Sequence, residues 1–130
     1  MRSVNKVIIV GHLAADPEVK QTVQGVTVAD FSVATNRDWK TTEGESRHAT
    51  DYHKVVAWRK LGEICGTYLK KGAGVYMEGR LVNRKYKDKQ GLDRYITEIV
   101  ADMVNFVSFK KNAGVDEMNL VEVDGSVEEA

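Results

Sequence analysis

Apolar and polar residues alternate along most of this chain, which is the pattern of strands that bury one face. Residues 4–13 differ, because β-branched and apolar residues fall on both faces, as expected of a strand covered on both sides or buried at a subunit contact. Residues 26–36 and 75–82 each have one apolar face, and residues 94–109 are apolar on both faces. With residues 51–60, these segments predict five β-strands.

One segment instead has helical periodicity. Its apolar stripe consists of Leu61, Ile64, Cys65, Tyr68 and Leu69. Positions three and four apart share one side of a helix, so the stripe predicts a helix packed on the strands. We expect Lys70 and Lys71 in its last turn and Gly72 in the left-handed conformation that ends it. Cys65 then lies on the buried side, where a cysteine is a core residue rather than a nucleophile.

The order of the predicted elements is three strands, one helix and two strands. A single helix between the third and fourth of five strands indicates an all-β, five-stranded OB-fold barrel. Polar residues 38–49 and 83–93 follow the second and fourth strands and predict long β-hairpin loops. The OB-fold domain is expected over residues 1–109, followed by an acidic tail over residues 110–130.

Charge is divided unevenly between these two parts, although the chain as a whole is neutral. All 19 basic residues lie at or before Lys111, and six of the 19 acidic residues follow it. A basic body with an acidic end is typical of nucleic-acid binders, and the alternative for the tail is a segment that only improves solubility. Residues 112–130 hold few apolar side chains, so we expect this segment to be disordered.

Candidate binding chemistry lies first on the strand over residues 51–60. Its alternation places Tyr52, Lys54 and Trp58 on one face, together with Val56. Aromatic rings stack on unpaired bases, and a lysine between them can reach the phosphate chain. The alternative is an ordinary strand whose aromatics pack under a loop.

The connection after the fourth strand carries a second candidate. Residues 84–89 interleave four basic residues with Tyr86, which suits phosphate contacts and base stacking. The alternative is a solvated hairpin that protects a sheet edge from aggregation. Trp39 lies in the other polar hairpin, where a tryptophan is unusual unless it packs or binds a ligand. The aromatics on neighbouring elements together favour nucleic-acid binding.

Several function classes lack the residues that they need. The carboxylates of the body are scattered singly, the histidines have no metal-ligand spacing, and no glycine-rich phosphate loop occurs. We therefore expect a protein that is not an enzyme and that uses no metal or cofactor. No apolar run approaches the roughly 20 residues needed to span a bilayer, and the single cysteine excludes an intramolecular disulfide. We therefore expect a cytosolic protein without membrane contact.

Several short motifs resemble the bacterial single-stranded DNA-binding protein family. They are VNKVIIVG at 4–11, DPEV at 16–19, YHKVV at 52–56, YLKKG at 68–72, YMEGRL at 76–81 and DRY at 93–95. The resemblance runs in register from about Ser3 to Phe106. It implies an OB-fold that assembles as a homotetramer and wraps single-stranded DNA.

The resemblance also implies roles for individual residues. The stacking positions would be Trp39, Tyr52, Trp58 and Tyr86. Three of these rings differ in type from those of the best-known members, but each keeps a π-face. The residues expected to contact phosphates are Lys54, Arg84, Lys85, Lys87, Arg37 and Lys71. The residues expected at the subunit contact are Val4, Lys6, Ile8, Val10 and His53, of which His53 matches a histidine that the family places there.

The predicted function is binding of single-stranded DNA with little sequence preference, which protects and organises exposed strands during replication, recombination and repair. The alternative is a dimeric OB-fold replication-restart or RNA-binding module. Family members usually end in an acidic tip with a proline and a terminal phenylalanine, which docks replication and repair proteins. Residues 125–130 here are acidic but contain neither a proline nor a phenylalanine. Replication and repair proteins are therefore possible partners, but the motif that would dock them is missing. The resemblance places the protein at the bacterial nucleoid.

Overall fold

The structure is a computed structural model that describes residues 1–112 and 115–120, with side chains up to Ser108. Its strands are β1 (Val7–Leu13), β2 (Glu18–Gln21), β3 (Thr27–Lys40), β4 (Ser46–Trp58), β5 (Gly74–Lys87), β6 (Asp93–Asn112) and β7 (Val115–Leu120). The helix of the described part of the chain is α1 (Arg59–Tyr68), between β4 and β5. This is the predicted all-β class, with the helix after the third barrel strand.

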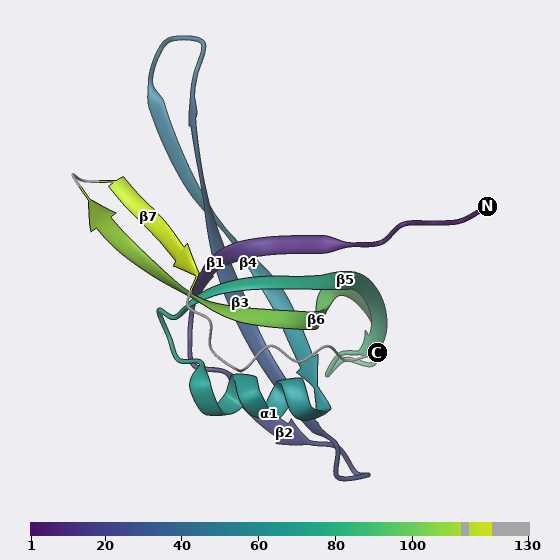
Figure 1. Cartoon of the computed structure of the whole chain (residues 1–130). Helices are drawn as coiled ribbons and strands as arrows, with labels where there is room; N and C mark the ends of the chain where they lie inside the picture. The colour runs from purple at the N-terminus through teal and green to yellow at the C-terminus, as the bar shows by residue number, and fades with distance from the viewer. Residues whose placement is uncertain (113–114, 121–130) are drawn as a thin grey trace.

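Five of the strands close into a barrel (Figure 1). Strand β1 pairs with β5, β5 with β6, β6 with β4, and β4 with β3, and a short pairing of β3 with β1 completes the ring. All of these pairs are antiparallel except β4 with β6, which run parallel. The pairing order confirms the OB-fold barrel that the element order predicted.

The barrel interior is filled by alternate residues of these strands. Val33, Val55, Val75 and Met77 are fully buried there, because every second side chain of a strand points inward. Helix α1 adds Leu61, Cys65 and Leu69 to the same core, and Figure 1 places it below the barrel strands. Cys65 is fully buried, which confirms its predicted place in the core, and burial raises the pKa of its thiol to about 12.

Two glycines allow the barrel strands to approach closely. A Cβ atom on Gly11 would collide with the carbonyl oxygen of Ala34, and one on Gly79 would collide with the carbonyl oxygen of Val100. Glycine at these two positions therefore marks a close approach of neighbouring backbones.

The strands extend much further than the sequence predicted. Residues 38–49 were expected to form a loop, but β3 and β4 remain paired up to Lys40 and Ser46, and the turn is confined to residues 41–45. The β5–β6 hairpin likewise pairs as far as Lys87 and Asp93. These arms carry few apolar side chains, so hydrophobic alternation could not reveal them. Figure 1 shows the β3–β4 arm projecting well beyond the barrel.

Two further elements differ from the prediction. Strand β2 pairs with β3 at residues that the sequence analysis left without regular structure, because all four of its residues are exposed. Helix α1 ends at Tyr68, so Lys70 and Lys71 lie beyond its last turn. Gly72 does adopt a left-handed conformation, with φ of 87°, but in the turn that follows the helix.

The acidic tail was expected to lack structure from residue 112 onward. The structure instead continues β6 to Asn112 and pairs β7 with it in antiparallel register. Residues 113–114 and 121–130 lie outside the described residues, and so does this part of the predicted tail. Within the described part, no helix is long and apolar enough to cross a membrane.

Candidate nucleic-acid interface

Strand β4 presents the predicted aromatic face to solvent. Tyr52 is 67% exposed and Trp58 is 39% exposed, whereas Val55 and Ala57 are completely buried in the barrel. The alternation therefore places both rings on the outer surface, as the sequence predicted. Val56 shares that outer face but is only 4% exposed, so neighbouring side chains cover the strand between the two rings.

Trp39 lies on the projecting part of β3, with its ring 44% exposed. The guanidinium carbon of Arg37 is 5.2 Å from the centroid of this ring, a cation–π distance. Arg37 also donates from Nε to Asp51 Oδ2 at 2.7 Å. A predicted phosphate contact and a predicted stacking ring are thus held together on the outer arm of the sheet.

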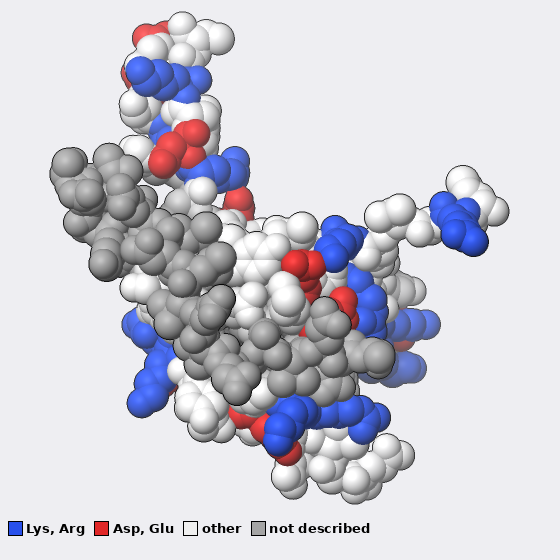
Figure 2. Space-filling view, viewed as in Figure 1, with Lys and Arg blue, Asp and Glu red and all other residues white. Residues whose placement is uncertain are grey.

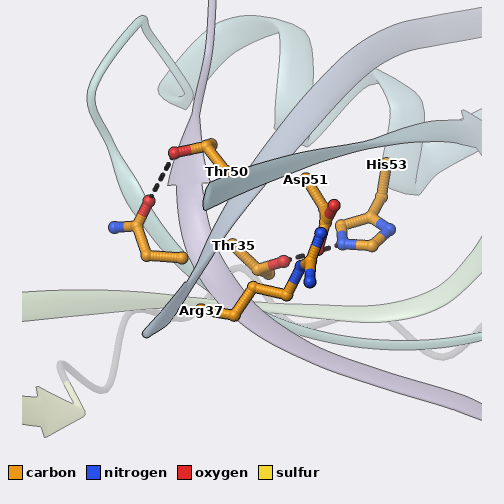
Figure 3. A network of polar contacts seen from close by, with 6 residues as sticks. Thr35, Arg37, Thr50, Asp51 and His53 are labelled. Carbon is orange, nitrogen blue, oxygen red and sulfur yellow. Dashed lines mark hydrogen bonds and ion pairs between the residues drawn. The ribbon is translucent and has the colours of Figure 1, made fainter. Parts of the chain in front are cut away.

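Polar pairs across β3 and β4 keep that arm ordered (Figure 3). Thr35 Oγ1 and His53 Nε2 are 2.8 Å apart, and Thr50 Oγ1 donates to the Asn36 side-chain oxygen at 2.9 Å. Figure 3 shows these contacts next to the Arg37–Asp51 pair, each one bridging the two strands. Such cross-strand pairs compensate for the missing apolar face where the hairpin leaves the barrel.

The β5–β6 hairpin carries the fourth ring. Tyr86 is 42% exposed, and the guanidinium carbon of Arg84 lies 5.9 Å from its centroid. Alternation along β5 puts Arg84 and Tyr86 on one face of the hairpin, and Lys85 and Lys87 on the opposite face. The structure therefore separates the basic residues of this hairpin into two groups that the sequence analysis had treated as one.

Asp88 organises the turn of this hairpin. Its carboxylate accepts hydrogen bonds from the backbone N–H groups of Gln90 and Leu92 and from Arg94 Nε at 2.9 Å. The hydrogen bond from Arg94, followed by that from the Leu92 amide, lowers the pKa of Asp88. On the adjoining arms, Lys85 pairs with Asp93 at 3.3 Å.

The buried carboxylate of Glu98 contacts cations from both β4 and β5. Glu98 is only 7% exposed, and its neighbour Ile99 faces the core, so Glu98 belongs to the outer face of β6. Arg84 Nε donates to Glu98 Oε1 at 3.3 Å, and Lys54 Nζ lies 4.0 Å from Oε2. In the sequence, Glu98 is one of the carboxylates scattered singly along the body. Its only local signal is a carboxylate directly before the apolar residues Ile99 and Val100.

A hollow of about 390 Å³ lies beside Tyr52. Lys20, Ser32 and Lys54 line it together with three carboxylates, those of Asp16, Glu18 and Asp30. The space is large enough to receive a group next to the exposed ring, but three carboxylates against two lysines make it less favourable for phosphates. From Lys54, a second cation, Arg84, is reached through the carboxylate of Glu98 that both contact.

The remaining predicted phosphate contact is Lys71. It is exposed in the turn between α1 and β5, and its backbone N–H donates to Asp16 Oδ1 at 2.8 Å. Figure 2 shows that Lys and Arg on the viewed face are spread over the projecting hairpin and the sides of the molecule, with acids between them. Among the described residues visible on that face in Figure 2, the bases form several separate groups.

The predicted subunit-contact residues of the first strand lie on and just before β1. Ile8 is 57% exposed and Val4 is almost fully exposed. Lys6 Nζ forms an ion pair with Glu78 Oε1 at 2.6 Å, and Tyr76 donates its hydroxyl to Glu78 Oε2 at 3.0 Å. The hydrogen bond from Lys6 is the main cause of a lowered pKa for Glu78.

One edge of β1 is largely unpaired within the described structure. From Val7 to His12 the strand pairs with β5, but on its other edge only His12 and Leu13 pair with β3. His53 is partly buried, and its Nε2 lies 2.8 Å from Thr35 Oγ1. The single chain thus shows an open edge and exposed apolar side chains at β1.

In the described residues, no group of three or more His, Cys, Asp or Glu side chains is arranged to hold a metal ion. The four predicted stacking rings are exposed, two of them next to an arginine, and two cations, Lys54 and Arg84, are anchored on Glu98. These groups suit unpaired bases and a phosphate chain.

Known proteins resemble this chain both in sequence and in fold. The sequence matches the single-strand binding protein family over residues 4–107. It is 43% identical over 114 residues to "Single-stranded DNA-binding protein 1" of Chlorobaculum tepidum, which covers 87% of this chain and 70% of that protein. The solved structure "Plasmodium falciparum SSB complex with ssDNA" superposes with a TM-score of 0.69 at 34% identity, covering 77% of this chain and 88% of that one.

Proposed function

The chain belongs to the single-strand binding protein family, and we propose that it binds single-stranded DNA with little sequence preference. One observation carries this proposal: four exposed rings lie on β3, β4 and β5, with cations held among them. The similar solved structure is a complex with single-stranded DNA, and the curated relative has the same binding in its name. Binding of this kind protects and organises exposed strands during replication, recombination and repair.

Base stacking supplies the first part of the mechanism. Bases of a single strand stack on Trp39, Tyr52, Trp58 and Tyr86, each contributing on the order of 1–3 kcal/mol. A duplex keeps its bases stacked inside the helix, so the rings cannot reach their faces. The protein therefore selects single strands. Because every base has a π-face, this contact does not distinguish one base from another.

Phosphate contacts supply the second part. Lys54 and Arg84 lie between Tyr52 and Tyr86 and follow the phosphate chain between stacked bases. Arg37 serves the same purpose beside Trp39. Lys85 and Lys87, on the opposite face of the hairpin, and Lys71, in the turn after α1, contribute where the strand wraps further around the protein. Each contacted phosphate releases condensed counterions, so affinity falls with salt.

Assembly into a homotetramer belongs to the same proposal. The open edge of β1, with the exposed Ile8 and Val4, supports a two-fold contact in which β1 of one subunit meets β1 of another. A second two-fold contact then joins two dimers. Lys6 and Val10 belong to the first contact, and His53, which is bonded to Thr35, lies near it and takes part in subunit contact.

The proposal treats the protein as a binding protein without catalytic activity that acts on DNA at the bacterial nucleoid. Its family comprises binding proteins, and its mechanism needs neither a metal nor a cofactor. Contacts with replication and repair proteins are included without an assigned docking segment, because residues 125–130 lie outside the described structure.

Tryptophan fluorescence tests this function directly, since Trp39 and Trp58 are both proposed contacts. Titration with a homopyrimidine single strand should quench the emission, and the same sequence as a duplex should quench it much less at equal concentration. The titration is repeated at two salt concentrations, and affinity should fall at the higher one. Equal quenching by the duplex would contradict the proposal.

A further inference from the structure

We propose that Glu98 is a positioning residue for DNA binding, which holds Arg84 and Lys54 beside one another on the outer face of the barrel. The inference rests on the proposed function, because Glu98 acts at the same surface. It starts from an unexpected feature of that surface: a carboxylate is buried at the centre of a face that binds a polyanion.

Burial of this carboxylate is costly unless it serves a purpose. Glu98 is 7% exposed, and among the described residues its Oε2 atom is buried without a hydrogen-bond partner. A carboxylate removed from water is destabilising unless cations and hydrogen-bond donors compensate for the loss, and an apolar residue would fill the same space at lower cost. The compensation that Glu98 receives comes from Arg84 and Lys54.

Arg84 is held from two sides. Its Nε donates to Glu98 Oε1 at 3.3 Å, and its guanidinium carbon lies 5.9 Å from the Tyr86 ring centroid. The guanidinium group has five N–H donors, and the contact with Glu98 uses only the one on Nε. The two terminal nitrogens remain for a bidentate contact with a phosphate. Glu98 thus fixes the orientation of Arg84 without occupying its phosphate-binding edge.

Lys54 reaches the same carboxylate from the other side. Strands β4 and β5 are not neighbours, because β6 lies between them. Lys54 on β4 and Arg84 on β5 nevertheless converge on Glu98 of β6. Two cations so close together repel one another unless an anion lies between them. Glu98 therefore makes a continuous phosphate track possible from Tyr52 to Tyr86.

The opposite role would also be consistent with a carboxylate at this place. Glu98 could act as an internal anion that competes with DNA for the two cations, in which case its removal would tighten binding. The geometry favours positioning, because Glu98 approaches Arg84 at Nε and leaves the terminal nitrogens free. Affinity measurements separate the two roles by their sign.

The test is a double-mutant cycle in the full chain, with a fluorescently labelled oligothymidylate as the probe. Glu98→Gln removes the charge and keeps the shape of the side chain. It should weaken binding on the order of threefold to tenfold at low salt, as for residues in one ion-pair network. It should also make the dependence of affinity on salt shallower, because fewer phosphates are contacted. In an Arg84→Gln, Lys54→Gln background, Glu98→Gln should have no further effect.

Asp102→Asn is the matched control. Asp102 lies on the same strand and accepts a hydrogen bond from Arg80 of β5 at 3.1 Å. The Asp102→Asn variant therefore removes one negative charge from an arginine–carboxylate pair, as Glu98→Gln does. Its affinity for the probe should equal that of the wild type. Thermal unfolding of each variant shows whether the barrel remains intact. If Glu98→Gln does not fold, Arg84→Lys replaces it, since it keeps the positive charge but loses the Nε contact, and it should bind more weakly.

Three results would overturn the inference. They are tighter binding by Glu98→Gln, an effect that persists undiminished in the Arg84→Gln, Lys54→Gln background, and wild-type affinity of Arg84→Lys. A wild-type protein that does not bind the probe would instead refute the proposed function itself. A wild-type protein that binds but shows no coupling in the cycle would refute only the role of Glu98.

Discussion

Arg37 lies over the ring of Trp39, with its guanidinium carbon 5.2 Å from the ring centroid. Its Nε atom also donates to Asp51 across the β3–β4 hairpin. The ring is thus supported by a cation that is itself fixed to the neighbouring strand. The same arrangement recurs at Arg84, which lies near Tyr86 and is fixed by Glu98. In both cases the cation and the ring form one unit, which suits a base and its adjacent phosphate.

Loss of a stacking ring should weaken DNA binding without unfolding the barrel. Replacing Trp39, Tyr52, Trp58 or Tyr86 singly with alanine should cost on the order of 1–3 kcal/mol of binding free energy, because each ring is exposed and contributes little to the core. Fluorescence anisotropy with a labelled single strand measures the loss.

Tyr95→Ala is the matched control for these four variants. Tyr95 is 74% exposed and lies opposite Lys85, on the other face of the hairpin from Tyr86. We expect it to bind DNA nearly as well as the wild type. A larger loss for Tyr95→Ala than for Tyr86→Ala would mean that DNA follows the opposite face.

Arg59 should limit the stability of the barrel. It has a φ of 60°, in the left-handed region that side chains other than glycine rarely adopt, directly after Trp58. That conformation costs about 1–2 kcal/mol for an L-residue, and glycine avoids this cost. Part of the gain is lost again, because glycine gives up more backbone entropy on folding. Arg59→Gly should therefore raise the free energy of unfolding by up to about 1 kcal/mol, measured by urea denaturation.

Arg59→Ala separates backbone strain from the loss of the side chain. Alanine keeps the Cβ atom and hence the strain, so this variant should not be more stable than the wild type. Equal stabilisation by alanine and glycine would show that the charge of Arg59 near the helix start, and not its backbone, is unfavourable.

The turn of the β5–β6 hairpin should lose order only in acid. The folded state lowers the pKa of Asp88 below its ordinary value, mainly through Arg94. A carboxylate with a lowered pKa contributes stability that is complete above the unfolded value of about 4 and is lost as the pH falls through the folded value. NMR titration of the Gln90 and Leu92 amides should therefore show a midpoint below 3.8.

A midpoint at or above the ordinary value would contradict the hydrogen bonds assigned to Asp88. Asp88→Asn should remove the titration of both amides at any pH. Asp93→Asn, in the neighbouring ion pair with Lys85, should leave it in place.

Charge on β1 should prevent assembly. Ile8 is exposed in the single chain and lies at the proposed two-fold contact, so Ile8→Asp places a carboxylate where two copies meet. Light scattering after gel filtration should show a tetramer for the wild type and smaller species for the variant. Val23→Asp, at a fully exposed turn, should leave the tetramer intact. A monomeric wild type at micromolar concentration would contradict the proposed assembly.

The sequence predicted those parts of the fold that burial determines. Alternation around Val55 and Ala57 placed β4 and its outer rings correctly, because the barrel core requires small or branched residues at every second position. It could not show how far the β3–β4 hairpin continues, since that arm is held by polar pairs such as Thr50 with Asn36. Such pairs become visible only once the register is known.

The composition of the candidate site was predictable, but its connections were not. Alternation and motifs located Tyr52, Lys54 and Tyr86. The anchor at Glu98 depends on β6 lying between β4 and β5, and a carboxylate in a strand has no sequence signal for partners on other strands. The division of the β5 cations between two faces likewise follows from the hairpin pairing, which the sequence analysis had treated as a loop.

The central claim is that exposed rings and anchored cations select unpaired strands. An equilibrium competition tests it most directly: the protein is bound to a labelled oligothymidylate and displaced by an unlabelled single strand, or by the same sequence as a duplex. The account predicts that the single strand displaces the probe at concentrations lower by orders of magnitude, and that its affinity has a log–log salt slope of about −0.7 for each contacted phosphate. Displacement by duplex and single strand at equal concentrations would contradict it.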